Sequence, residues 1–271
     1  MRPGPVVFAL ILLLATPALC SARQITVDET WSGVVKVDDR VVVEKGVKLR
    51  ILPGTRVTFA KGKLDDEGFP EAGILVNGTI DAKGTPEARI VFTSAEDAPA
   101  GGDWGEIKLI ASPGSAFTNC DFTYATWGLH LHDSALKVAG CTFTRNSAGG
   151  IRGLGGAIEI TRCTITGLDT GIRYWRSNPK IHHNTITGNG TGIFMRDDAD
   201  GSYIKYNNIY GNTEYNLKLG DGQKNDVDAR LNWWGSKDLK VIRAKIFDKK
   251  RDKFVGKVAI QPILKDKVPQ Q

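Results

Sequence analysis

The central part of the chain repeats a short motif about every 22 residues. The motif is Cys-x-Phe, relaxing to Cys-x-Ile and Asn-x-Ile. It begins at positions 120, 141, 163, 184 and 207, so its intervals are 21, 22, 21 and 23 residues. A second series keeps the same phase: Gly128-Leu129, Gly150-Ile151, Gly171-Ile172, Gly192-Ile193 and Asn216-Leu217. Two markers that share one period predict a solenoid of stacked coils.

The residues between the markers decide which kind of solenoid forms. A period near 22 also fits leucine-rich repeats, but these segments are short, β-branched and punctuated by Gly, Asn, Asp and Ser. None is long and periodic enough for a helix. The upstream half is less regular but has the same character, with predicted strands at 34–37, 41–43, 49–51, 57–59, 74–76, 90–92 and 107–109. The sequence therefore predicts an all-β fold, a single-stranded parallel β-helix with terminal caps.

Stacking explains two apolar columns. Equivalent side chains in successive coils lie about 4.8 Å apart, the spacing of hydrogen-bonded strands. The first predicted inward column is Leu129, Ile151, Ile172, Ile193 and Leu217, and the second is Phe122, Phe143, Ile165, Ile186 and Ile209. Each buried side chain contributes roughly 1.5 to 3 kcal/mol relative to exposure.

A third column should carry side chains that hydrogen-bond from coil to coil. An amide at a turn can bond both to its own turn and to the identical amide one coil away. The predicted ladder is Cys120, Cys141, Cys163, Asn184, Asn207 and Asn232. We expect free thiols, because parallel Cβ vectors about 4.8 Å apart exceed the roughly 3.8 Å of a disulfide.

The ends of the chain differ from its middle. Arg2, an apolar run at 6–15 and small residues up to Ala22 predict a signal peptide over residues 1–22. Lipidation at Cys20 is disfavoured because Leu19 precedes it. The β-helix is predicted over 23–235 and a basic closing segment over 236–271. We therefore expect an exported protein, periplasmic, cell-surface or secreted, with no transmembrane segment.

Several motifs resemble a known fold family. Besides the repeats, they are Leu49–Thr55 (LRILPGT), Ile80–Thr85 (IDAKGT), Ile90–Ser94 (IVFTS), Trp104–Ile107 (WGEI) and Leu231–Gly235 (LNWWG). They resemble exported right-handed parallel β-helix repeat proteins of the pectate-lyase-like superfold. The resemblance implies a right-handed coil, closing strands near 241–242 and 255–262, and tryptophans 233 and 234 as plugs of the core. It leaves the function open, since that superfold hosts lyases, hydrolases, epimerases, adhesins and proteins without chemistry.

Residues that alternate with the inward column should form an outer face. One predicted outward column is His130, Arg152, Arg173, Phe194 and Lys218, and its neighbour is His132, Leu154, Trp175 and Arg196. Arginine pairs with carboxylates in a bidentate fashion, and flat rings pack on sugars. The predicted ligand-binding residues are therefore His130, Arg152, Arg173, Trp175, Arg196 and Lys218, with an acidic polysaccharide as ligand. The alternative is a solvated face without a ligand.

Catalysis would need further groups on this face. His132 with Asp133 as its orienting carboxylate is a candidate base, and Arg173 and Arg196 could neutralise a uronate. If the protein only binds its ligand, no cofactor is expected. If it is an enzyme, Ca²⁺ is the expected cofactor. The candidate Ca²⁺ ligands are Asp197, Asp198 and Asp200, which fit a polar turn equally well. His182-His183 alone is weak evidence for a metal site.

Three functions follow from these patterns. The first is a non-catalytic binding or scaffold protein for acidic polysaccharide or cell-envelope glycan. The second is a polysaccharide lyase or epimerase acting on polyuronates, and the third is a periplasmic accessory protein for metal-site maturation. No nucleic-acid partner is expected, because the chain shows no nucleic-acid-binding motif.

Overall fold

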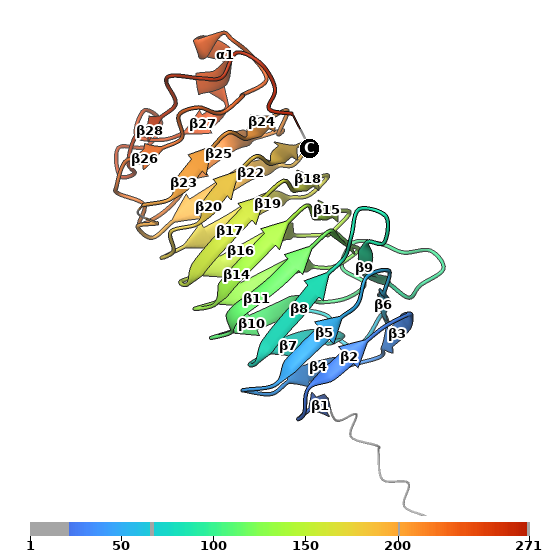
Figure 1. Ribbon diagram of the computed structural model, residues 1–271. Coiled ribbons are helices and arrows are strands. Elements are labelled where there is room, and N and C mark those ends of the chain that lie inside the picture. Colours follow the sequence, from blue (N-terminus) through green and yellow to red (C-terminus); the bar gives the residue numbers. More distant parts are fainter. Residues whose placement is uncertain (1–21, 66–67, 200, 270–271) are drawn as a thin grey trace, which may run out of the picture.

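The computed structural model describes residues 22–65, 68–199 and 201–269. The predicted signal peptide, apart from Ala22, lies outside the described residues. Three long parallel sheets, here called A, B and C, run along the molecule (Figure 1). In each sheet a strand pairs with the strand three positions later in the chain, except at the last pair of sheet A, so three strands make one coil.

The strands of each sheet are as follows. Sheet A contains β1 (Arg23–Ile25), β4 (Arg40–Val43), β7 (Gly73–Val76), β10 (Ile107–Ile110), β13 (Trp127–His132), β16 (Gly149–Leu154), β19 (Thr170–Trp175), β22 (Thr191–Arg196), β25 (Tyr215–Leu219) and β27 (Ile246–Phe247). Sheet B contains β2 (Glu29–Trp31), β5 (Lys48–Ile51), β8 (Thr79–Lys83), β11 (Pro113–Thr118), β14 (Ala135–Ala139), β17 (Ala157–Thr161), β20 (Lys180–His182) and β23 (Tyr203–Lys205). Sheet C contains β3 (Val34–Val37), β6 (Arg56–Phe59), β9 (Ile90–Ser94), β12 (Cys120–Thr123), β15 (Thr142–Thr144), β18 (Thr164–Thr166), β21 (Thr185–Thr187) and β24 (Asn208–Tyr210). A small sheet joins β26 (Val227–Asp228) to β28 (Val258–Ala259).

The predicted β-helix is confirmed down to its register. Leu129, Ile151, Ile172, Ile193 and Leu217 are in register on sheet A. The second column is in register on sheet C, and every member of both columns is at most 1% exposed. Aromatic stacking reinforces the second column, with ring centroids of Phe122 and Phe143 4.6 Å apart. This axial core aligns the coils and therefore the side chains on their outer faces.

The ladder column is a continuous series of hydrogen bonds. Asn207 Oδ1 accepts from the backbone N–H of Asn184 at 3.0 Å and from its Nδ2 at 2.9 Å. Asn232 accepts from Asn207 in the same way. In the earlier coils Cys141 Sγ lies 3.4 Å from the N–H of Cys120. The three thiols are free and buried.

The residue before each ladder position turns the chain. Six residues there have left-handed backbone angles: Asn119, Gly140, Arg162, His183, Tyr206 and Leu231. Such angles direct the side chain of the following ladder residue toward the adjacent coil, where it reaches the equivalent ladder residue. His183 therefore belongs to a turn that recurs in every ladder coil.

The segment after Gly235 closes the rod, and one expectation there was wrong. Residues 241–242 lie in α1 (Leu239–Ala244), the only helix in the described residues, and not in a strand. Asp238 caps this helix by accepting from the Lys240 N–H, and Arg243 lies in its last turn, where a cation suits the helix dipole. Beyond it, β27 adds to sheet A, while Trp234 is buried and Trp233 is half-buried. Within the described residues, no helix has the length and apolar character needed to cross a membrane.

Candidate functional site

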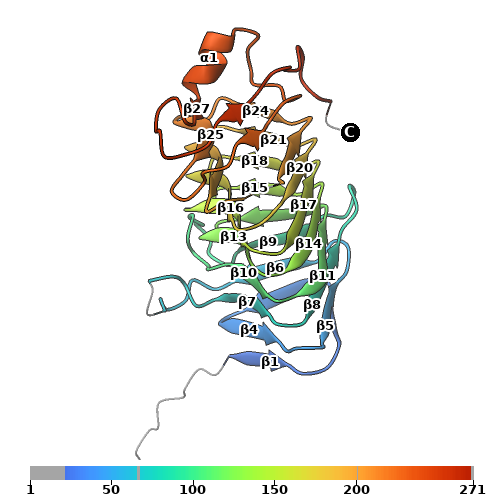
Figure 2. The same cartoon turned by 90° about the vertical axis from the view of Figure 1, so that its left-hand side faces the viewer.

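The outer face of sheet A carries cations and aromatic rings in strict register. His130, Arg152, Arg173, Phe194 and Lys218 follow one another on successive strands. The neighbouring column holds His132, Leu154, Trp175 and Arg196. We call Arg152, Arg173, Trp175, Phe194, Arg196 and Lys218 the cation–aromatic face. The loop between β6 and β7 projects beside this sheet (Figure 2).

Within the cation–aromatic face, positive groups alternate with rings. The Arg173 guanidinium lies 5.6 Å from the Trp175 ring centre and 5.3 Å from that of Phe194. The Lys218 ammonium lies 5.5 Å from the same Phe194 ring. The Phe194 ring occupies the place where a side chain at Gly220 would stand, since a Cβ there would come within 2.5 Å of it. The Phe194 ring therefore lies close over Gly220, within cation–π distance of both Arg173 and Lys218.

Arg173 and Lys218 are the two cations of this face without an ion pair among the described residues, and Arg173 is the one held between two rings. Among the described residues no carboxylate lies within ion-pairing distance of it, whereas Arg152 pairs with Glu106 at 2.9 Å and Arg196 with Asp197 at 3.3 Å. The buried Nε of Arg173 also has no hydrogen-bond partner. Partial burial, followed by repulsion from Arg196 and Arg152, lowers the pKa of Arg173. An anion placed beside the guanidinium would meet a cation that has no ion pair among the described residues.

Beside Arg152, a carboxylate and two histidines form a chain of contacts that we call the histidine relay. Glu106 Oε1 lies 2.6 Å from His130 Nδ1, and His130 Nε2 lies 2.8 Å from His132 Nε2. One assignment of protons satisfies both contacts: His130 donates from Nδ1 to Glu106 and accepts at Nε2 from His132. The 2.9 Å approach of Arg152 Nη2 to His130 Nδ1 is then a contact and not a hydrogen bond. His132 is left with a lone pair on Nδ1.

Burial keeps both histidines of the relay neutral. Desolvation lowers the pKa of His130 to about 4, against the opposing effect of Glu106. It also lowers the pKa of His132, helped by the positive charges of Lys108 and Arg152. Glu106 stays ionised, because its contacts with His130 and Arg152 lower its pKa although burial opposes this. A neutral, oriented imidazole is a proton acceptor at neutral pH.

Comparison with known families agrees with the coil geometry. Residues 127–232 match a model described as right handed beta helix region, and residues 21–152 match one described as pectate-lyase like beta helix domain. The chain is a right-handed, pectate-lyase-like β-helix. No curated protein and no solved structure matches it. For this β-helix the comparisons therefore establish the fold and leave the chemistry to the outer faces.

The structure of the β-helix corrects two expectations about chemistry. His132 contacts His130 and not Asp133, which is exposed at a left-handed turn. The clustered carboxylates that hydrolases of this fold use were not expected on this face, but the structure places one carboxylate there, that of Glu106, which pairs with Arg152. Glu106 belongs to the motif at 104–107, which is clear in the sequence. Its side chain reaches Arg152 two coils away, and the spacing of motifs does not predict such a contact.

The metal candidates are occupied by other contacts. Asp197 pairs with Arg196, and Asp198 Oδ1 accepts from the Lys224 N–H at 3.1 Å. Asp200 lies outside the described residues. His182 Nδ1 and His183 Nδ1 are 3.0 Å apart. No group of three or more His, Cys, Asp or Glu in the described residues is arranged to hold a metal ion.

Two aromatic residues of the site were missed in the sequence. The Arg152 guanidinium lies 5.4 Å from the Trp127 ring and 5.7 Å from the Phe69 ring. Trp127 directly precedes the Gly128 marker, and its ring fills the space above Gly149. Phe69 comes from the loop between β6 and β7, whose position no repeat could predict.

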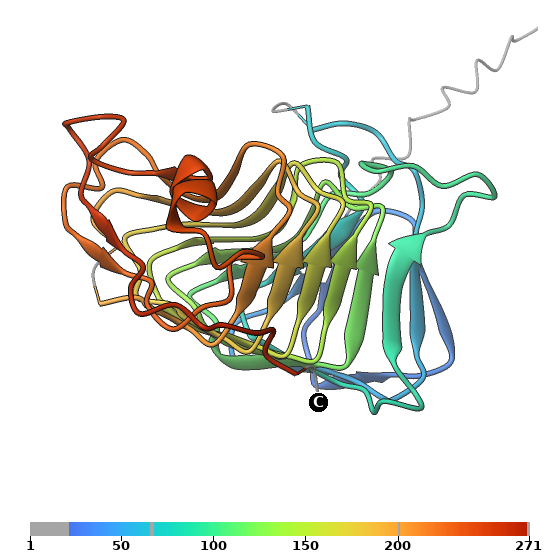
Figure 3. The same cartoon turned by 90° about the horizontal axis from the view of Figure 1, so that it is seen from above.

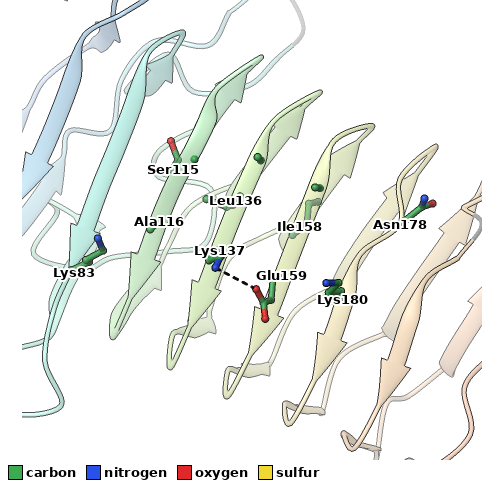
Figure 4. A pocket seen from close by; sticks show the side chains of 12 residues that line it. Lys83, Ser115, Ala116, Leu136, Lys137, Ile158, Glu159, Asn178 and Lys180 are labelled. Carbon is green, nitrogen blue, oxygen red and sulfur yellow. Dashed lines mark ion pairs between the residues drawn. The ribbon is translucent and has the colours of Figure 1, made fainter.

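A hollow lies on a different face. It has a volume of about 420 Å³ on the outer side of sheet B, where small residues such as Ala116, Ala135 and Ala157 form the floor (Figure 4). Lys137 and Glu159 stand above this floor as a long ion pair of 3.9 Å. The residues that line the hollow include neither aromatic rings nor the histidine relay. We weigh the unpaired, partly buried cation on sheet A above the volume on sheet B.

Proposed function

We propose that this β-helix binds an acidic polysaccharide along the cation–aromatic face and does no chemistry on it. The observation that carries the proposal is Arg173, a half-buried cation held between two rings with no carboxylate partner among the described residues. A polymer carboxylate would supply the missing partner, and Trp175 and Phe194 would pack on sugar rings.

The repetition of cations suits a polymer better than a single small acid. Arg152, Arg173 and Lys218 lie on adjacent or nearly adjacent coils, which repeat every 4.8 Å or so along the axis. Single exposed ion pairs contribute little, but several contacts on one polymer add through avidity. Exposed charges are screened over about 8 Å at physiological salt, so binding should weaken as salt rises.

The test compares wild type with the Arg173→Ala/Arg196→Ala variant on polygalacturonate, alginate and a neutral glucan. We expect wild type to bind the two acidic polymers and not the glucan. The variant should bind the acidic polymers at least about tenfold more weakly than wild type. Equal retention of all three polymers, or identical behaviour of the two proteins, would leave the face with a structural role only.

The histidine relay favours a second candidate, a uronate lyase or epimerase. His132 Nδ1 would take the proton from the carbon beside the uronate carboxylate, and Arg173 would stabilise the charge that develops there. In a lyase the freed electron pair forms a carbon–carbon double bond as the glycosidic C–O bond breaks. The departing oxygen then takes the proton from the His132 imidazolium. Absorbance of unsaturated uronate, lost in His132→Gln, would support this candidate, and its absence with a polymer that binds would favour the non-catalytic protein.

A further inference from the structure

The positive charge of the molecule is concentrated at one end. Residues 236–271 contain eleven Lys and Arg and four Asp, a net charge of +7, whereas the whole chain carries +6. The first 235 residues are thus close to neutral. We call residues 236–269, the described part of this segment, the basic cap. It carries α1 and closes the end of the rod opposite β1 (Figures 1 and 3), while its last residues run back beside the coils, where Val268 bonds to Asn208.

The lysines of the basic cap are not neutralised by its acids. Two of the four carboxylates bond to backbone N–H groups, since Asp238 caps α1 and Asp252 accepts from the Phe254 N–H. The other two form ion pairs, Asp248 with Arg243 and Asp266 with Lys237. In the described residues, the exposed cations without an ion pair include Lys240, Lys249, Lys250, Lys253 and Lys257.

Large apolar side chains are exposed among these lysines. Phe254 is 74% exposed, the highest value for any large hydrophobic residue described, and Val241 is 53% exposed. Leu239 is 37% exposed on the same short helix as Val241. The turn at 249–254 adjoins that helix, because Arg251 Nη2 donates to the Ala244 carbonyl at 2.9 Å. Apolar and cationic groups therefore share one compact unit, held on a buried base that includes Ile242 and Val255.

We propose that the basic cap docks on the surface of a bilayer that contains anionic phospholipid, with Phe254 entering the headgroup region. The lysines supply the electrostatic attraction, which falls off within a Debye length, and the apolar side chains gain by leaving water. A soluble polyanion would use the lysines and leave Phe254, Val241 and Leu239 in water. A second copy of the cap would be repelled by its own net positive charge. The end-on position of the cap lets it meet a flat surface without obstruction from the coils.

The experiment measures cosedimentation of the full chain with vesicles of phosphatidylcholine alone and with vesicles of equal parts phosphatidylcholine and phosphatidylglycerol. We expect binding to the mixed vesicles only, with loss at high salt. The Lys249→Gln/Lys250→Gln/Lys253→Gln variant should bind on the order of 100-fold more weakly, since each lysine near an anionic surface contributes about fivefold. Phe254→Ser should bind about tenfold more weakly.

The matched control is Val34→Ser, which removes an apolar side chain that is 68% exposed in the near-neutral part of the chain. It should bind like wild type. Circular dichroism and melting of each variant check folding, which exposed substitutions should leave intact. Equal binding to both kinds of vesicle, no vesicle binding, or retention of wild-type affinity by Phe254→Ser would overturn the proposal. Binding of polygalacturonate by the cap lysines without vesicle binding would overturn it in favour of a polymer surface.

Discussion

Sheets A and B of the same β-helix show how one repeat can present two different outer faces. Both sheets place one residue per coil at each outward position, about 4.8 Å apart. On sheet B two outward lysines have acidic partners: Lys83 lies 2.8 Å from Asp81 on the same strand, and Lys137 lies 3.9 Å from Glu159 on the next strand. Lys180 is exposed and has no ion pair among the described residues. Between these charged residues lie alanines (Figure 4).

Sheet A differs in the surroundings of its charges. Arg173 has no partner among the described residues, aromatic rings hold the cations in place, and a buried carboxylate orients two neutral histidines. Burying unpaired charge and orienting neutral histidines both carry a free-energy cost that a solvated face avoids. The difference is that sheet A carries groups its own residues do not balance, and this is the reason for placing the proposed polymer site there and not at the hollow on sheet B.

The strongest challenge to this comparison is a charge reversal on each face. Arg173→Glu should weaken polygalacturonate binding on the order of 100-fold, because it removes a cation and adds repulsion to the polymer carboxylates. The matched variant, Lys180→Glu on sheet B, should change affinity less than about twofold. Titration by calorimetry or fluorescence measures both. Similar losses in the two variants would mean that binding follows net charge and not the cation–aromatic face.

The register of sheets A and C was predictable because it depends on side chains that repeat. Leu129 and Ile151 recur at one spacing and must face inward, so the residues after them, His130 and Arg152, had to face outward. The same logic placed Asn184 on the ladder. A second amide column, running through Asn189, Asn212 and Asn216, went unnoticed although its first two members keep the same phase.

Contacts that cross coils or come from loops were not predictable. Glu106 reaches His130 from the preceding coil, and Phe69 reaches Arg152 from the loop between β6 and β7, whose length the repeat does not determine. The helix at 239–244 was missed because two β-branched residues, Val241 and Ile242, favour a strand locally. In the structure, the Asp238 cap and the burial of Ile242, the one buried residue of the helix, stabilise the helix against that propensity.

The next test is the free energy of unfolding at acid pH. Among the described residues, the histidine relay on sheet A contains the one buried histidine, His130, and this histidine is neutral. The pKa of His130 is about 4 in the folded protein and about 6.5 in an unfolded chain. Between these values the unfolded state binds more protons, so stability falls as pH falls. The free energy of unfolding should drop by about 2 kcal/mol from about pH 7 to about pH 5 through this group. His130→Gln should show a correspondingly flatter profile in urea unfolding, and an unchanged slope would show that the ring titrates normally.

Polymer affinity should respond to pH through His132. Its pKa lies below the ordinary value in the free protein, because of burial and the nearby charges of Lys108 and Arg152. A bound polyanion would raise that pKa, so binding takes up protons and affinity rises as pH falls, by roughly fivefold from about pH 7 to about pH 5. His132→Gln should remove most of this rise. Measuring binding in buffers of different ionisation enthalpy reports the proton uptake directly, and no uptake in wild type would separate the relay from the polymer site.

The smallest expected effect belongs to sheet B, and it completes the comparison. Lys137 is 78% exposed at its side chain and meets Glu159 at 3.9 Å, so Lys137→Ala should change the free energy of unfolding by less than about 0.5 kcal/mol. Arg152→Ala, its counterpart on sheet A, should cost about 1 to 3 kcal/mol, because it leaves the mostly buried Glu106 with one partner fewer. Chemical denaturation of both variants at neutral pH measures the two values. If Lys137→Ala proved as destabilising as Arg152→Ala, or reduced polymer affinity, the sheet B pair would be part of a working site. The alanine-floored face of sheet B could then no longer serve as the reference against which sheet A is judged.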